Sequence, residues 1–127
     1  MGARGRIIVG TSGWSYDEWR GSFYAGVPQK DWLAHCATHF NGVEVNASFY
    51  RFVQAAVVKR WRDQTPTGFV FAIKGHRLAT HVRRLAAAAE IIASMRESLA
   101  PLGDRLAAVL WQLPPNMPKD AARLAAF

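Results

Sequence analysis

The chain has 127 residues, half of them hydrophobic and a fifth charged, and its 16 basic against 9 acidic residues give a formal net charge of +7. This composition is ordinary for a folded protein and excludes a disordered chain, so we expect residues 1–127 to form a single domain. Cys36 is the only cysteine, which excludes an intrachain disulfide and a thiolate metal cluster. The basic start is followed by only three apolar residues, Ile7 to Val9, too few for a secretory signal, and no apolar run approaches the ~20 residues of a membrane span. These features predict a cytoplasmic protein with no membrane partner.

Most of the basic excess is arginine, and it is spread along helix-like segments rather than gathered in a dense block. A solvated helix face explains these arginines (Arg60, Arg62, Arg83, Arg84, Arg96 and Arg123). The net charge also favours a polyanionic or phosphorylated partner through long-range attraction. Nucleic-acid binding therefore stays open as an alternative, although the sequence contains no recognisable nucleic-acid motif.

Strand-like and helix-like segments alternate four times along the chain. Apolar and β-branched runs predict strands at residues 6–12, 43–46, 69–74 and 107–112. Helical spacing of apolar residues predicts helices at 29–39, 55–64, 82–100 and from 119 onward, separated by proline and glycine breakers. This order implies parallel strands joined by right-handed crossovers, and hence an α/β architecture. Between the first strand and the first helix, a loop rich in aromatic residues and glycine is expected to have its own packing.

The alternation of side chains along these strands separates a polar face from an apolar face. The apolar face suits packing against helices (Ile7, Val9, Val43, Val45, Phe69, Phe71, Ile73, Val109 and Trp111). The other face carries small and polar residues (Gly10, Ser12, Glu44, Asn46, Ala72, Lys74, Ala108, Leu110 and Gln112). No G-x-G-x-x-G motif follows the first strand, which disfavours a dinucleotide-binding fold. A (β/α) barrel fits better, and in a barrel the polar residues would line the mouth at the carboxyl ends of the strands.

Four motifs in order carry a resemblance to a known family: GTSGWSYDEWRGSFY (Gly10 to Tyr24), FNGVEVNASFYR (Phe40 to Arg51), TPTGFVFAIKGHRLATH (Thr65 to His81) and LWQLPPN (Leu110 to Asn116). The chain resembles the N-terminal part of the DUF72, or YecE-like, family, whose members look like TIM barrels. The resemblance implies a fold and a site face but no reaction. Family members are usually about twice as long, so only about four of eight βα units are expected here.

Half a barrel would leave two unpaired sheet edges and an uncovered interior. We favour a fragment of a larger barrel. Pairing of two copies, or an open four-stranded layer that associates with something else, are the alternatives. Self-association is expected if the chain is truly half a barrel.

Glu44 and Lys74 are the central residues of the predicted site. Glu44 could act as a general base or as a ligand of a metal or a sugar hydroxyl. Alternatively, it forms a buried ion pair with Lys74 on the neighbouring strand. Lys74 is expected to hold an anionic substrate group rather than to form a Schiff base. His81, in the loop after the third strand together with His76, is a candidate for proton transfer.

The remaining candidates would bind rather than react. Asn46 and Gln112 could orient a ligand through their amides, or simply bond loop backbone. Trp14 and Tyr50 could stack on a ligand or serve as packing, and Ser12 lacks the frame of an activated serine nucleophile. His35 and His39 have a spacing that can hold zinc, but a helix-surface pair is favoured and no metal site is predicted.

These residues leave three hypotheses for function, and none of them names a cofactor. The first is an enzyme acting on a phosphorylated or polyhydroxylated small molecule, with Glu44, Lys74 and His81 as catalytic residues. Its binding residues would be Ser12, Trp14, Asn46, Tyr50 and Gln112. The second is a non-catalytic module for nucleic acid or another anionic partner, and the third is an inactive truncated barrel.

Overall fold

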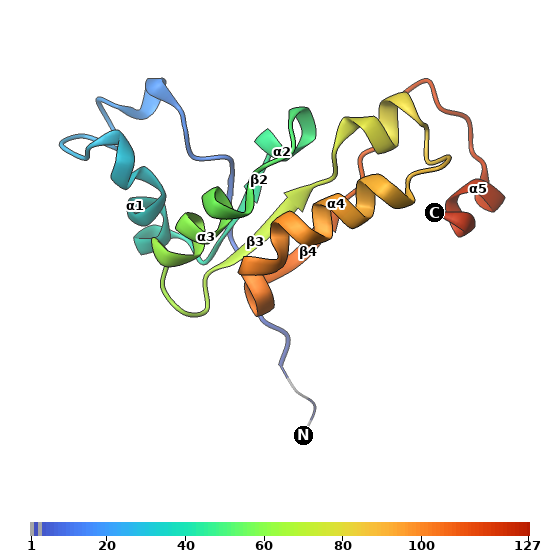
Figure 1. Cartoon of the computed structure of the whole chain (residues 1–127). Coiled ribbons are helices and arrows are strands. Elements are labelled where there is room, and N and C mark those ends of the chain that lie inside the picture. The colour runs from blue at the N-terminus through green and yellow to red at the C-terminus, as the bar shows by residue number, and fades with distance from the viewer. Residues whose placement is uncertain (1, 3) are drawn as a thin grey trace.

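The computed structural model describes residue 2 and residues 4–127, and it contains one four-stranded parallel sheet (Figure 1). The strands are β1 (Gly10–Ser12), β2 (Gly42–Val45), β3 (Val70–Lys74) and β4 (Leu106–Leu110). They lie in the order β1-β2-β3-β4, and every neighbouring pair is parallel. The predicted α/β architecture with parallel strands is therefore confirmed.

The helices follow the strands in the predicted alternation. They are α1 (Trp32–His39), α2 (Ala47–Tyr50), α3 (Ala55–Asp63), α4 (Ala89–Leu99) and α5 (Ala121–Ala126). Shorter helical turns are η1 (Asp17–Trp19), η2 (Gln29–Asp31), η3 (Leu78–Val82) and η4 (Ala100–Arg105). In Figure 1, α1, α3 and α4 lie along one side of the sheet. Within the part of the chain that the structure describes, no helix has the length and apolar character that a membrane crossing needs.

The main core lies between the sheet and these helices. Val43 and Val45 of β2, and Phe71 and Ile73 of β3, are all buried there, as the alternation of the sequence predicts. Helices α3 and α4 close this core with buried apolar residues (Val58, Met95 and Leu99), and Val109 and Trp111 pack against it. The apolar face of the sheet is thus the face that holds the fold together.

The aromatic loop between β1 and α1 forms a second core, as predicted. Tyr24 is fully buried and stacks on Trp32 with 4.4 Å between ring centroids and an angle of 4° between planes. The Tyr24 hydroxyl donates to the Trp14 carbonyl at 2.6 Å, so the Cys36 thiol, 3.0 Å away, is left to donate to the Tyr24 oxygen. Burial raises the pKa of the Cys36 thiol, which agrees with the prediction of a small buried hydrophobe rather than a nucleophile.

The first strand is shorter than predicted, and the prediction that Ile7 and Val9 pack against helices is wrong. Ile7 and Val9 are 80% and 58% exposed instead of packed against helices. The Asn41 side chain holds this segment, because it accepts from the Val9 amide at 2.7 Å and donates to the Ile7 carbonyl at 2.9 Å. Ladder pairing with β2 begins only at Gly10, and β1 is the edge strand of the sheet.

The predicted helix 82–100 is also wrong in its first part, because α4 begins at Ala89. Arg84, Leu85 and Ala87 have positive φ angles of 49°, 69° and 48°, which a right-handed helix excludes. Leu85 is buried, and its amide donates to the Ala79 carbonyl at 2.8 Å. This packing onto η3 overrides the high helix propensity of the alanine-rich sequence.

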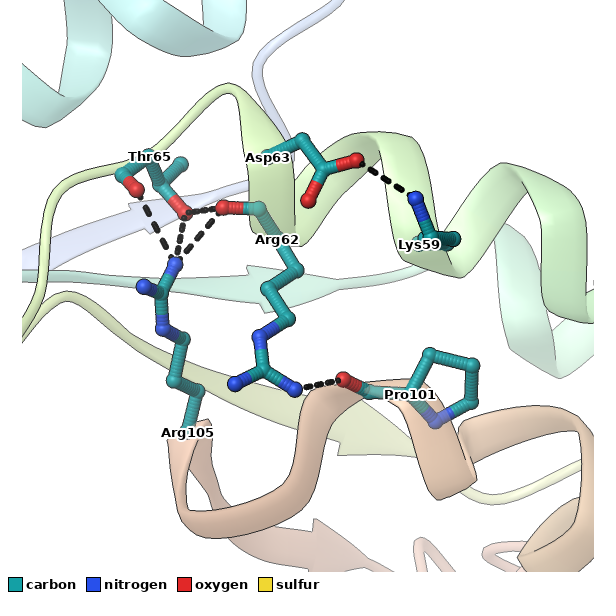
Figure 2. A network of polar contacts seen from close by, with 6 residues as sticks. All are labelled: Lys59, Arg62, Asp63, Thr65, Pro101 and Arg105. Carbon is teal, nitrogen blue, oxygen red and sulfur yellow. Dashed lines mark hydrogen bonds and ion pairs between the residues drawn. The ribbon is translucent and has the colours of Figure 1, made fainter.

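Arginines tie the loops together at the amino ends of β3 and β4 (Figure 2). Arg105 donates to the carbonyls of Arg62 and Thr65, at 2.6 Å and 2.9 Å, and to the Thr65 hydroxyl at 3.2 Å. Arg62 donates to the Pro101 carbonyl at 2.8 Å, while Lys59 and Asp63 form an exposed ion pair at 3.1 Å. Arg62 is exposed, as the predicted solvated face requires, and its guanidinium also connects α3 to η4.

The opposite face of the sheet is open among the residues that the structure describes. Gly10, Ser12, Ala108 and Leu110 are exposed there, and Glu44 and Ala72 are half-buried. These strands border a hollow of about 330 Å³, which we call the inner hollow (Ile8, Gly10, Ser12, Gly42, Glu44 and Ala72). The fold thus presents one face to its helices and leaves the face with the polar residues accessible.

Candidate functional site

The parallel sheet brings the carboxyl ends of all four strands to one edge, and the candidate residues lie near that edge. Across the sheet, Ser12 is paired in register with Glu44, Glu44 with Ala72, and Lys74 with Leu110. Glu44 and Lys74 therefore share the open face, with Lys74 two residues nearer the carboxyl edge. Most of the candidate side chains fall into three separate groups.

The first group is Ser12 with Glu44, in the inner hollow. The Ser12 hydroxyl donates to Glu44 Oε1 at 3.2 Å, and the Gly13 amide donates to the Glu44 carbonyl at 2.7 Å. These bonds fix both the backbone and one oxygen of the carboxylate, and leave the other oxygen available. The alternative prediction, an ion pair of Glu44 with Lys74, is not among the ion pairs of the described residues.

The second group, which joins Lys74 to His81, is centred on the ring of Phe49. The Lys74 ammonium lies 4.3 Å from the centroid of the Phe49 ring, and the His81 ring meets the same Phe49 edge-on at 5.0 Å. Helix α2 is held in place to allow this, because the Ser48 hydroxyl donates to the Lys74 carbonyl at 2.6 Å. Tyr50 is exposed beside Phe49, with 4.9 Å between ring centroids. This arrangement gathers a cation, an imidazole and a phenol at the edge.

The two histidines after β3 differ in environment. His76 is only 8% exposed, stacks on Phe52 at 4.1 Å, and accepts from the Leu78 amide through Nδ1 at 3.0 Å. Burial first, and then the charge of Arg77, lower the pKa of His76, so it is neutral and structural. His81 is half-buried, with Nδ1 2.8 Å from the Thr80 hydroxyl. His81 is therefore the more accessible of the two histidines.

The third group is Trp14 with Asn46, and it lies apart from the other two. Both residues line a groove of about 430 Å³ between the loop after β1 and helix α3. Asn46 Oδ1 is buried and has no hydrogen-bond partner among the described residues. Since Val45, Val57 and Trp61 line the same groove, it opens on the helix-covered side rather than into the inner hollow.

Gln112 joins none of these groups. Strand β4 ends at Leu110, so Gln112 lies exposed in the segment after the strand. The sequence reasoning also overlooked Phe49, although it connects Lys74 to His81. The position of Phe49 could have indicated this role, because Phe49 and Tyr50 both follow the polar end of β2. The sequence prediction names only Tyr50.

Residues of metal-binding type do not gather near these groups. Across residues 2 and 4–127, the structure contains no cluster of three or more His, Cys, Asp or Glu side chains that could hold a metal ion. The helical pair His35 and His39 packs against Phe23 instead, at 4.8 Å and 5.1 Å between ring centroids. This is the helix-surface environment that the sequence favoured for the pair.

Four parallel βα units with their polar residues at the carboxyl edge of the sheet define a truncated TIM-barrel-like α/β fold. Residues 8–127 match the family described as "Protein of unknown function DUF72". The chain is 31% identical over 108 residues to the UPF0759 protein YecE of Escherichia coli strain K12, and 32% identical over 117 residues to the UPF0759 protein YunF of Bacillus subtilis strain 168. The protein belongs to the DUF72 family, which confirms the resemblance seen in its motifs.

Solved structures agree with this assignment. The chain matches a DUF72 family protein from Thermotoga maritima MSB8 with a TM-score of 0.78 at 25% identity, and one from Enterococcus faecalis V583 with a TM-score of 0.76 at 23% identity. The matches cover 93% and 94% of this chain but 48% and 44% of those chains. With YecE and YunF the matches cover 85% and 86% of this chain but 38% and 40% of those proteins. The chain therefore spans less than half the length of the relatives it matches.

Proposed function

We propose that the protein is an enzyme that acts on a phosphorylated or polyhydroxylated small molecule at the carboxyl edge of its sheet. The observation that carries this proposal is the environment of Lys74. Its ammonium faces an aromatic ring, and within residues 2 and 4–127 no carboxylate lies within the 4.0 Å of an ion pair. A half-buried cation without a counter-ion is suited to receive an anionic group from a ligand.

The contact between Lys74 and Phe49 is weak enough for the Lys74 ammonium to leave the ring and bind a ligand instead. A cation–π contact contributes only about 0.5–2 kcal/mol, whereas a charge-assisted hydrogen bond to a phosphate is stronger. Lys74 can therefore turn from the ring to a ligand at little cost. The ring meanwhile limits the positions that the flexible lysine explores, which reduces the entropy lost on binding.

In this proposal, Glu44 acts on the part of a ligand that extends from Lys74 into the inner hollow. One strand spacing of ~4.8 Å and two residue rises of ~3.3 Å separate their Cα atoms by roughly 8 Å. A phosphorylated sugar of five or six carbons is long enough to span such a distance. The carboxylate would accept a hydroxyl or carbon-bound proton as a general base, with Ser12 orienting it. His81, close to Lys74 through Phe49, would return a proton, which is the chemistry of an isomerising or hydrolytic enzyme.

The test is a calorimetric titration with glucose 6-phosphate, and with inorganic phosphate as a minimal anion. We expect Lys74→Met to weaken binding of inorganic phosphate at least tenfold and to lower the number of glucose 6-phosphate molecules bound per chain. Lys59→Met is the matched control, because Lys59 is an exposed lysine paired with Asp63 and should leave affinity within twofold. Equal losses in the two variants, or no binding of either probe at 10 mM, would show that the Lys74 site is not an anion site.

A second measurement separates catalysis from binding. Glu44→Gln keeps the size of the side chain and removes the base, so we expect glucose 6-phosphate to bind within about threefold of the unaltered protein. Any conversion of the sugar phosphate, followed by ¹H NMR, should be lost in this variant. Conversion that persists in Glu44→Gln would contradict the role of Glu44 as the base.

A further inference from the structure

We propose that the groove lined by Trp14, Ser15, Asn46, Arg51, Val57 and Trp61, which we call the outer groove, is a second binding site. It would take a small anionic molecule in which a hydroxyl or amine donor lies beside a ring. The site is separate from the inner hollow, because Ser12, Glu44 and Lys74 do not line it. It therefore does not rest on the function proposed for Lys74.

The unpartnered oxygen of Asn46 is the first observation behind this site. Oδ1 has lost its contact with solvent, and no described residue donates to it. A buried acceptor without a donor lowers the stability of the fold, so such atoms are rare in folded proteins and need a reason. Asn46 precedes helix α2 but its side chain makes no capping bond there. A rotation of the Asn46 amide toward the outer groove, which its residue lines, would expose this oxygen to a donor on a ligand.

Arg51 is the observation that indicates an anionic ligand. It is exposed at the rim of the outer groove, and none of the ion pairs among the described residues involves it. This differs from Arg62 and Arg105, whose guanidinium groups are bound to backbone carbonyls. A guanidinium that faces a groove and lacks a protein acceptor is suited to a phosphate or carboxylate.

The walls and the volume of the outer groove indicate the shape of the ligand that fits it. Trp14 and Trp61 meet edge-to-face with 5.5 Å between ring centroids, and both pack against the main core. Rigid aromatic walls favour a ring-bearing ligand, since little side-chain freedom is lost on binding. The volume of about 430 Å³ lies in the range of small-molecule sites. A sugar phosphate with its ring against the two tryptophans, its phosphate on Arg51 and a hydroxyl on Asn46 fits these three features.

The proposal predicts opposite effects of one substitution on stability and on binding. Asn46→Leu keeps the side-chain size and removes the unpartnered oxygen, so the thermal midpoint should rise by about 2–6 °C. The same variant should bind ribose 5-phosphate at least tenfold more weakly, as measured by tryptophan fluorescence, because Trp14 and Trp61 line the outer groove. Arg51→Gln should weaken binding similarly without raising the midpoint. Arg60→Gln, an exposed arginine on α3 outside the outer groove, is its control and should change neither.

Lys74→Met distinguishes this site from the inner hollow, and we expect it to leave the fluorescence titration unchanged. If Lys74→Met abolishes the signal, the two sites are one and the proposal of a second site is wrong. A fluorescence signal that stays flat to 10 mM ribose 5-phosphate would also overturn it. So would an Asn46→Leu variant that is less stable and binds normally, because a water molecule would then be the partner of Oδ1.

Discussion

The two ends of the parallel sheet differ in whether their polar side chains have protein partners. At the amino end, Arg62 and Arg105 donate to the carbonyls of neighbouring loops, and the cationic groups have protein partners (Figure 2). At the carboxyl end, Lys74 faces only an aromatic ring and Asn46 Oδ1 has no donor among the described residues. Satisfied polar groups stabilise a fold, whereas a buried polar group without a partner needs an explanation. We therefore assign stability to the amino end of the sheet and propose binding at the carboxyl end.

The largest effect on stability should come from the amino end. Replacing Arg105 with Met removes three hydrogen bonds from one guanidinium nitrogen, and we expect a loss of about 2–3 kcal/mol in the free energy of unfolding. Lys74→Met at the carboxyl end should change it by less than about 1 kcal/mol, because it removes only a cation–π contact. Urea denaturation of both variants measures the difference. Equal losses would mean that Lys74 is a structural residue.

A substitution at Gly75 tests how tightly the carboxyl end of the sheet is packed. It is buried directly after Lys74, and a Cβ atom there would collide with the ring of Trp111. Since Trp111 packs edge-on against Phe127 at 4.9 Å, the ring cannot move freely, and Gly75→Ala should cost about 1–3 kcal/mol. Gly21→Ala, which meets no atom within 4 Å, is the control in the same denaturation experiment. An unchanged stability in Gly75→Ala would show that this end is loosely packed.

The pH dependence of stability should reveal the burial of His76. Burial lowers the pKa of His76 below its ordinary value of about 6.5, so the unfolded chain binds a proton more readily than the folded one. The stabilisation from neutral His76 is present above pH 6.5 and declines as the pH falls below that value toward the pKa of the folded state. His76→Phe should flatten the fall between pH 6.5 and 5 in thermal melts. A fall of unchanged steepness in His76→Phe would contradict the assignment of His76 as a buried neutral residue.

The smallest effect on stability is expected in the segment before β1. Ile8 is 43% exposed and lines the inner hollow, so Ile8→Asn should change the free energy of unfolding by less than about 0.5 kcal/mol. Its effect should appear in association instead, because an exposed apolar face packs readily against another chain. Sedimentation velocity of the 127-residue chain should show self-association that weakens in Ile8→Asn. An unaltered chain that remains monomeric at 100 μM would contradict this expectation.

Most of the fold could be predicted from the sequence because strand periodicity is a local signal. The alternation of Val43, Glu44 and Val45 already determines which side chain faces the helices, and the structure agrees. The signal failed where a distant contact decides the conformation. Burial of Leu85 against η3 breaks an alanine-rich helix, and the Asn41 side chain, not a strand partner, holds residues 7–9.

The candidate site was less predictable for the same reason. Glu44 and Lys74 lie on the open face as expected, but Asn46 was expected to share that face. Strand β2 ends at Val45, and Asn46 has helical angles of φ −94° and ψ −26°, so the alternation no longer applies to it. Its amide instead faces the outer groove with Trp14. The helical backbone angles of Asn46 turn its side chain from the open face of the sheet to the outer groove, and neither the composition nor the spacing of the sequence reveals this turn.

The comparison of the two ends is tested most directly by mapping where a sugar phosphate binds. In a ¹⁵N-resolved NMR titration of the 127-residue chain with glucose 6-phosphate, we predict shifts confined to the carboxyl end of the sheet. The affected amides would lie in segments 12–16, 44–51 and 74–81. Shifts concentrated in segments 62–69 and 101–106, or spread along the arginine-bearing helices, would contradict the assignment of binding to the carboxyl end.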